Sequence, residues 1–215
     1  MLTLYYGSGS PYAWRVWLAL EHKQINYQLK SMSFGAGDLK TPEYLRLNPR
    51  GKVPAIVDDG FALYESAAIV EYLEEKYPRS GKSLFPGDAK QHALTRRVIN
   101  EADHYLDSSS RKLLTAVLFT KPEQWDERVI GHGRETLGSE LARFESMLNA
   151  DFFANELSAA DFAIYPMVAL ALRMDVKKPD LNICGLIGPR ISAWMGRIEA
   201  LPYFDKTFPP HWKKS

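Results

Sequence analysis

The sequence contains a single cysteine, Cys184, so it has no internal disulfide framework and no cysteine-based metal site. Its five histidines show no ligand spacing of the H-x-x-x-H kind. The longest apolar run, Phe162 to Leu172, contains Pro166 and is too short to cross a bilayer. We therefore expect a soluble protein of a reducing, cytoplasmic compartment that holds no metal.

An excess of charge of one sign is also missing. The chain has 27 basic and 26 acidic side chains and a net charge of +1, which argues against attachment to nucleic acid or to a membrane surface by bulk electrostatics. Residues 131–133 read Gly-His-Gly but lack the third glycine and the preceding strand of a nucleotide-binding loop. Met1 leads directly into a strand-like segment, so we expect no secretory signal. Because the net charge is close to zero, local groups must hold any anionic ligand.

What the sequence does contain is an ordinary globular composition, 46% hydrophobic and 25% charged over 215 residues, enough for one large domain or two small ones. The first part alternates between strand and helix patterns. Residues 2–6 predict a strand, and Ser10 followed by Pro11 predicts the N-cap and first turn of a helix. Residues 25–29 then predict a second strand.

The stretch from Asn48 to Ser66 predicts a β-hairpin followed at once by a helix. Residues 58–60, Asp-Asp-Gly, suit the turn of the hairpin. The pattern then changes to helical spacing, with Glu65 or Ser66 in the capping position, and ends before Pro78. The N-terminus of such a helix offers backbone N–H groups and a partial positive charge to a carboxylate.

The second part of the chain is helical in pattern throughout. Residues 79–87 have the composition of a linker, and Asp88 suits the N-cap of the next helix. Ser158 with Asp161 three residues later forms a capping-box variant that opens an apolar helix. We expect the last helix near residues 191–198 and an aromatic, proline-rich tail that packs over the surface.

Four residue pairs in the first part stand at a characteristic joint spacing: Ser10-Pro11, Arg15-Val16, Val53-Pro54 and Glu65-Ser66. Together they resemble the serine-type members of the glutathione transferase family. The resemblance implies a thioredoxin-like βαβαββα domain over residues 1–78, an all-helical domain over residues 88–215, and a homodimer. It also implies glutathione as co-substrate.

The resemblance carries six residues over as glutathione-binding candidates: Lys40, Lys52, Val53, Pro54, Glu65 and Ser66. It implies a cis peptide bond before Pro54, and it assigns the backbone of Val53 to the cysteinyl residue of glutathione. Ser66 and the helix N-terminus suit the γ-glutamyl carboxylate, while Glu65 suits the ammonium group. The two lysines are candidates for the glycine carboxylate.

Ser10 matches the serine that donates a hydrogen bond to the glutathione sulfur in the serine-type members. A thiol with a pKa of about 8.5 is only about 3% ionised at pH 7, and lowering that pKa by two units takes about 2.7 kcal/mol. A hydrogen bond to a charged acceptor supplies roughly 1.5–3 kcal/mol and a helix N-terminus about 0.3–1 kcal/mol. No general base is required. Tyr6 and Ser8 are the rival positions for this role.

The resemblance places a pocket for a hydrophobic electrophile between the two domains. Tyr12, His104 and Tyr105 are its candidate lining residues. Other glutathione-dependent reactions on the same scaffold, such as isomerisation, dehalogenation or peroxide reduction, remain open, as does a non-catalytic ligand-binding protein. Because the sequence reads Ser-Pro-Tyr where maleylacetoacetate isomerases carry Ser-Ser-Cys, it favours a detoxifying transferase over an isomerase.

Overall fold

The computed structural model describes residues 1–213, which form two compact units. The first unit contains residues 1–87 together with the chain from Leu201 onward, and the second contains Asp88–Ala200. Our domain prediction had placed the chain after Ala200 in the helical part, whereas it clusters with the first unit.

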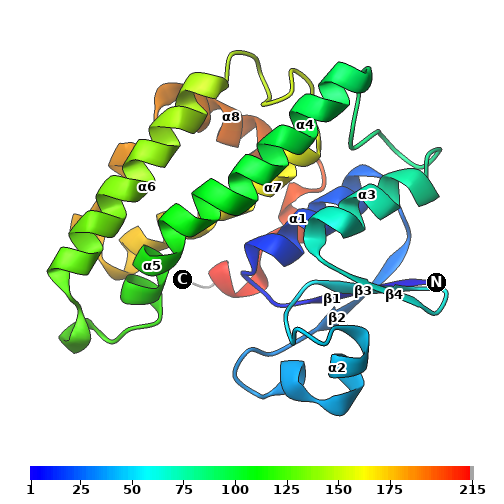
Figure 1. Ribbon diagram of the computed structural model, residues 1–215, viewed down its shortest axis with the longest axis horizontal. Helices are drawn as coiled ribbons and strands as arrows, with labels where there is room; N and C mark the ends of the chain where they lie inside the picture. Colours follow the sequence, from blue (N-terminus) through cyan, green and yellow to red (C-terminus); the bar gives the residue numbers. More distant parts are fainter. Residues whose placement is uncertain (214–215) are drawn as a thin grey trace. The chain divides into compact units, whose positions relative to one another are not determined.

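The first unit is built around one four-stranded sheet. Its strands are β1 (Leu2–Tyr6), β2 (Tyr27–Ser31), β3 (Ala55–Asp58) and β4 (Phe61–Tyr64). The strand order is β2-β1-β3-β4, with β1 parallel to β2 and antiparallel to β3, and β3 antiparallel to β4. Its helices are α1 (Pro11–His22), α2 (Pro42–Leu47), α3 (Ser66–Lys76) and α9 (Phe204–Thr207). Helices α1 and α3 cover one face of the sheet and α2 the other (Figure 1). This arrangement confirms the predicted thioredoxin-like domain.

The register of the sheet puts apolar side chains into the core between the strands and α1. Leu4 of β1 lies opposite Leu29 and Ile56, and Leu4 and Ile56 are fully buried. Val16 and Leu20 of α1 are equally buried. Because each fully buried aliphatic side chain contributes about 1.5–3 kcal/mol, this core fixes the ends of β1 and α1 between which Ser10 lies.

Strand β2 begins two residues later than the sequence predicts. Gln24 adopts the left-handed conformation (φ 53°) after α1, its N–H donates to the carbonyl of Glu21, and the N–H of Ile25 donates to the carbonyl of Leu20. These bonds form a Schellman motif, which uses the residues up to Ile25 to end the helix. The strand therefore starts only at Tyr27.

The C-terminal segment does not merely lie on the surface, as the sequence pattern suggested. Trp14 of α1 meets the rings of Phe204, Phe208 and Trp212 at centroid distances of 6.0, 5.7 and 5.6 Å. Its indole N–H also donates to the buried hydroxyl of Thr207 at 3.0 Å. The segment thus completes the core of the first unit around α1.

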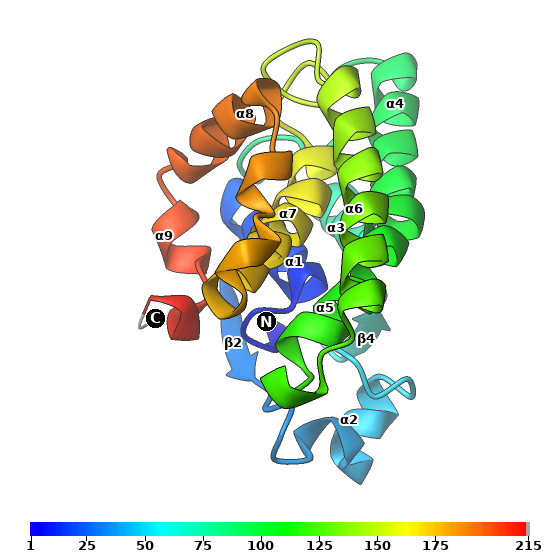
Figure 2. The same ribbon diagram turned by 90° about the vertical axis from the view of Figure 1, so that its left-hand side faces the viewer.

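The second unit consists of helices. They are α4 (Ala89–Glu101), α5 (Asp107–Leu118), α6 (Glu127–Met147), α7 (Ala159–Lys177) and α8 (Pro189–Glu199). A π-helical turn, Ala102–Leu106, joins α4 to α5, and α6 returns beside α5 (Figures 1 and 2). The predicted capping box opens α7, because Ser158 and Asp161 each bind the other's backbone N–H. Residues 159–169 of α7 are all buried. The succession of helices confirms the all-helical second part.

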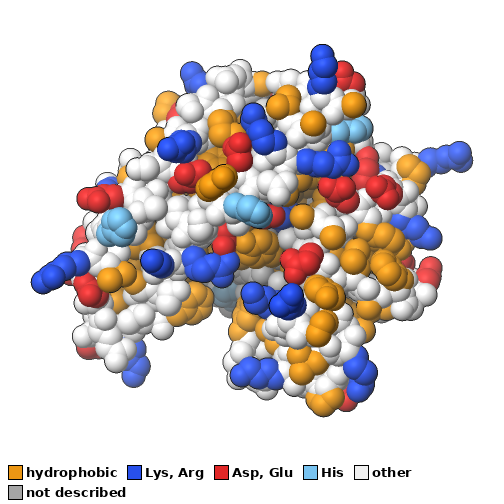
Figure 3. Space-filling view, viewed as in Figure 1, with side chains coloured by type: hydrophobic (Ala, Val, Ile, Leu, Met, Phe, Trp, Pro, Cys, Tyr) orange, Lys and Arg blue, Asp and Glu red, His pale blue; other side chains and the backbone are white. Residues whose placement is uncertain are grey.

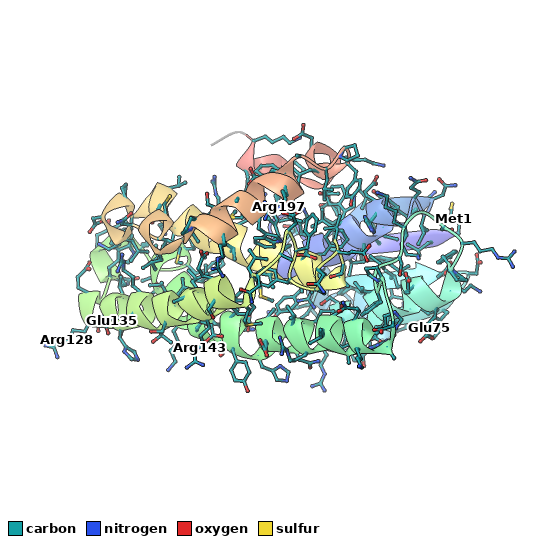
Figure 4. All side chains as sticks on the ribbon, turned by 90° about the horizontal axis from the view of Figure 1, so that it is seen from above. Met1, Glu75, Arg128, Glu135, Arg143 and Arg197 are labelled. Atoms are coloured by element: carbon teal, nitrogen blue, oxygen red, sulfur yellow. The ribbon has the colours of Figure 1, made fainter. Side chains whose placement is uncertain are left out.

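One face of the surface carries charges of both signs without separating them. Basic and acidic side chains alternate over the face drawn in Figure 3. Along α6, Arg128, Glu135 and Arg143 are exposed and lie in a row that Figure 4 shows in profile. Within residues 1–213, no helix is both long and apolar enough to cross a membrane.

Candidate active site

The site begins at the N-terminus of α3, where Glu65 is the N-cap residue. Its backbone has φ 71° and ψ 109°, an unusual conformation for a residue with a side chain, which costs on the order of 1–3 kcal/mol. The carboxylate of Glu65 is exposed and makes no capping hydrogen bond to the helix. The backbone N–H groups of the first helical turn are therefore left for another acceptor, and Glu65 stands next to them as a negative charge.

Ser66, the first residue of α3, is supported from below by a buried arginine. Arg15 of α1 is only 1% exposed, and its Nη1 donates to the Ser66 hydroxyl oxygen at 3.2 Å. Its guanidinium also lies 5.4 Å from the centroid of the Tyr12 ring. The hydroxyl oxygen of Ser66 accepts from Arg15, so the hydroxyl hydrogen of Ser66 is available to another acceptor. Ser66 therefore offers an anion a hydrogen-bond donor that lies next to the positive charge of Arg15.

The peptide bond between Val53 and Pro54 is cis, as the resemblance implied. Pro54 is buried at the start of β3 and Val53 is half-buried. Among residues 1–213, no group forms a hydrogen bond with the amide or the carbonyl of Val53. Partly buried backbone groups are normally paired, so a peptide ligand that adds a strand here would satisfy both.

The backbone just before Val53 is clamped by two side chains that the sequence did not single out. The carbonyl of Lys52 accepts from the Tyr44 hydroxyl at 2.5 Å and from Asn48 Nδ2 at 2.7 Å. Both donors are buried, and burial raises the pKa of Tyr44 to about 12, so its hydroxyl stays protonated at neutral pH. This clamp fixes the direction in which Val53 presents its amide and carbonyl.

The two candidate lysines are placed differently. The side chain of Lys52 is exposed next to Val53. Lys40 is exposed at the end of a short 3-10 turn, Asp38–Lys40, that precedes α2. Neither ammonium group is held by another described residue in an ion pair, so both are available to a carboxylate.

Ser10 closes a tight turn at the end of β1. Its N–H donates to the carbonyl of Gly7 at 3.0 Å, and Gly9 has φ 82°, which the third residue of a type II turn requires. Ser10 is the N-cap of α1, and its Oγ accepts from the N–H of Ala13 at 3.3 Å. Its O–H hydrogen is directed to none of residues 1–213. The hydroxyl therefore caps the helix and remains free to donate.

The two rival hydroxyl groups are used differently. The Tyr6 ring packs against Trp17, with centroids 5.0 Å apart. Ser8 Oγ lies 2.6 Å from His211 Nδ1, at hydrogen-bond distance. His211 was not anticipated, since nothing in the sequence pattern links residue 8 with the far end of the chain.

The three predicted pocket residues belong to different units. Tyr12 is a half-buried residue of α1 in the first unit. His104 and Tyr105 lie on the π-helical turn of the second unit, where both are exposed. Their role toward an electrophile stays a prediction. Over the described residues, no group of three or more His, Cys, Asp and Glu side chains is arranged to hold a metal ion.

Comparison with known proteins points to one family. The family described as glutathione S-transferase, N-terminal domain, matches residues 9–76. Glutathione S-transferase 3 of Zea mays is 30% identical over 96% of this chain and 92% of its own length. A maleylacetoacetate isomerase of Mus musculus is 32% identical over 92% of this chain and 87% of its own. The crystal structure of a glutathione S-transferase from the Antarctic clam Laternula elliptica superposes with a TM-score of 0.82, at 32% identity, over 100% of this chain and 94% of that one.

Fold and relatives thus agree, and the chain belongs to the glutathione S-transferase family. Members of this family are enzymes that use glutathione as co-substrate.

Proposed function

We propose that the protein binds glutathione in its first unit and that the Ser10 hydroxyl stabilises the glutathione thiolate for attack on a hydrophobic electrophile. The observation that carries this proposal is the free O–H of Ser10 at the N-terminus of α1. A donor and a helix N-terminus at one point favour the charged form of the thiol by roughly 2–4 kcal/mol together, which is enough to ionise most of it at pH 7.

The backbone groups at the edge of the sheet support the binding half of the proposal. The amide and carbonyl of Val53 pair with the cysteinyl residue of glutathione, as in β-strand addition. The N-terminus of α3 and Ser66 take the γ-glutamyl carboxylate, and Glu65 takes the neighbouring ammonium. The exposed ammonium groups of Lys52 and Lys40 take the glycine carboxylate.

The choice of Ser10 over its rivals rests on the position of each hydroxyl and on the contacts of each side chain. Ser8 is engaged with His211, and the ring of Tyr6 packs on Trp17. Ser10 alone among the three combines a free donor with a helix N-terminus. This is the serine-type mechanism, in which no general base takes part.

The test measures the ultraviolet thiolate absorbance of bound glutathione against pH, together with conjugation of a chromogenic electrophile. In the wild type we expect a thiol pKa lowered by about one unit or more. Ser10→Ala raises the thiol pKa most of the way to its ordinary value and slows conjugation about tenfold or more, with little loss of glutathione affinity. Ser10→Thr, which keeps the hydroxyl, retains most of the activity. Unchanged conjugation in Ser10→Ala, with loss in Tyr6→Phe, would transfer the role to Tyr6.

The isomerase among the relatives makes glutathione-dependent isomerisation the second candidate function. The two reactions differ in their balance of thiol. Conjugation forms a carbon–sulfur bond and consumes one glutathione per turnover, whereas isomerisation returns glutathione unchanged. Measuring total free thiol during turnover of maleylacetoacetate and of an electrophilic aryl halide distinguishes them.

The setting of this activity follows from the same resemblance. We propose a homodimer that acts in detoxification in the cytoplasm. A chain with one cysteine cannot form an internal disulfide, so it has no need of an oxidising compartment. Sedimentation of the purified protein tests the dimer, since a single species at the mass of one chain would contradict it.

A further inference from the structure

The turn that carries Ser10 is packed against the far end of the chain. The four residues from Gly7 to Ser10 form this turn, which we name the serine turn. His211 lies against it at two residues: its Nδ1 is 2.6 Å from Ser8 Oγ, and its ring faces Gly9. A Cβ atom added to Gly9 would lie only 2.9 Å from His211 Cε1. Glycine at this position thus serves both the positive φ and the close approach of the imidazole.

His211 is held in this place by its neighbours. It lies on a 3-10 turn, Pro210–Trp212, closed by the N–H of Trp212 donating to the carbonyl of Pro209 at 2.9 Å. The Trp212 ring is buried, edge-on to Trp14 of α1 at 5.6 Å. The cavity between the serine turn and the chain at Thr207 and Pro209 has room for about one water molecule and is too small for a ligand. The packing of Trp212 and the 3-10 turn therefore fix the backbone position of His211.

The consequence concerns the direction of the Ser10 hydroxyl. Ser10 is covalently joined to Gly9, and the turn has only one backbone hydrogen bond of its own, from Ser10 N to the carbonyl of Gly7. Two glycines in four residues give the turn many alternative conformations. Contact with His211 at its second and third residues restricts them, so the turn presents Ser10 in one orientation.

We propose that His211 is a positioning residue for thiol activation, acting through Ser8 and the serine turn on Ser10. This inference rests on the proposed role of Ser10. His211 itself touches neither the thiol nor the electrophile in this role. Its effect is to keep the hydroxyl of Ser10 preorganised, and preorganised donors are worth more to a developing charge than mobile ones.

The experiment compares Ser8→Ala, His211→Ala, the double variant and His211→Asn by the thiol pKa of bound glutathione, and by kcat and the KM for glutathione. Each single variant is expected to raise the bound thiol pKa by about 0.4–1 unit and to lower kcat two- to tenfold, with the KM for glutathione nearly unchanged. The double variant should be no worse than the worse single variant, because each single variant already removes the hydrogen bond between Ser8 and His211. His211→Asn, whose side chain has polar atoms near the position of Nδ1, recovers most of the loss.

Controls separate positioning from folding. His132→Ala removes an exposed histidine of α6 in the second unit and leaves the thiol pKa as in the wild type. Ser8→Ala removes one hydroxyl from a surface turn and tests the proposal even where a change at residue 211 loosens the C-terminal segment. A lowered thiol pKa in the wild type that neither single variant shifts would overturn the role of His211 and leave that of Ser10 intact. An unshifted thiol in the wild type would overturn both.

Discussion

The buried histidine at the end of α1 gives the protein a stability that depends on pH. His22 is only 5% exposed, and its Nδ1 lies 2.7 Å from the hydroxyl of Tyr203. The pKa of His22 is lowered from 6.5 to about 4, mainly by burial and also by the positive charges of Lys82 and Lys23, against the opposing backbone hydrogen bond of Ser83 and the negative charge of Glu74. In the folded protein His22 is therefore neutral at pH values where the unfolded chain already protonates it.

The sign and size of the effect follow from linkage. The folded pKa lies below the unfolded one, so the unfolded state binds more protons between them and the free energy of unfolding falls as the pH falls from 6.5 to about 4. One pKa unit corresponds to about 1.4 kcal/mol, so His22 alone removes about 3 kcal/mol over this range. For a chain of this length, that loss corresponds to a decrease in Tm of about 6–12 °C.

His22→Asn keeps a polar side chain near Tyr203 but does not titrate. We expect the variant to be less stable than the wild type at pH 7, and the difference between them to shrink by about 3 kcal/mol as the pH falls to 4. Urea unfolding of both proteins at pH 7, 6, 5 and 4 measures this difference while all other titrating groups cancel. His132→Asn, at an exposed position, serves as the control, and its free energy of unfolding should differ from that of the wild type by the same amount at every pH. Parallel curves for His22→Asn as well would refute the reasoning.

Two further predictions concern the ends of α3 and α7. Ser66→Ala should weaken glutathione binding about tenfold to a hundredfold, because a charged carboxylate loses a hydrogen bond, whereas Ser66→Thr should bind nearly as well as the wild type. Isothermal titration calorimetry measures both affinities, and an alanine variant that binds as tightly as the wild type would show that Ser66 is not part of the site. Ser158→Ala removes half of the capping box of α7 and should lower the free energy of unfolding by about 0.5–2 kcal/mol without changing the thiol pKa of bound glutathione, so a stability equal to wild type in urea would contradict the cap's role.

Local signals made a large part of this structure predictable. The N-caps Ser10 and Ser158, the hairpin turn near Gly60 and the helix start at Glu65 each depend on residues within a few positions of one another, and each appears where the sequence places it. The exceptions are also local. Strand β2 starts late because the Schellman motif that ends α1 extends through Ile25. Strand propensity alone does not show that these residues are needed to end the helix.

The supports of the candidate site were not predictable in this way. Arg15 reaches Ser66 across 51 positions, and His211 reaches Ser8 across 203. Such contacts join polar residues of common types with no periodicity, so only the folded chain brings them together. The hydrogen bond from Tyr44 to the Lys52 carbonyl spans only eight positions but was equally unpredictable. A tyrosine in a short helix predicts a packing role and gives no indication of the partner of its hydroxyl.

This division has a physical reason that bears on where specificity can change. Glutathione is a peptide, so its recognition draws mainly on backbone groups and helix termini, whose geometry short motifs encode. The side chains that support those groups include Arg15 and His211, which come from distant parts of the chain and contact Ser66 and Ser8. Substitution at Arg15, Tyr44 or His211 should therefore alter how well the site is organised while the recognised peptide stays the same, whereas substitution at Glu65 or Ser66 should alter which peptide is bound.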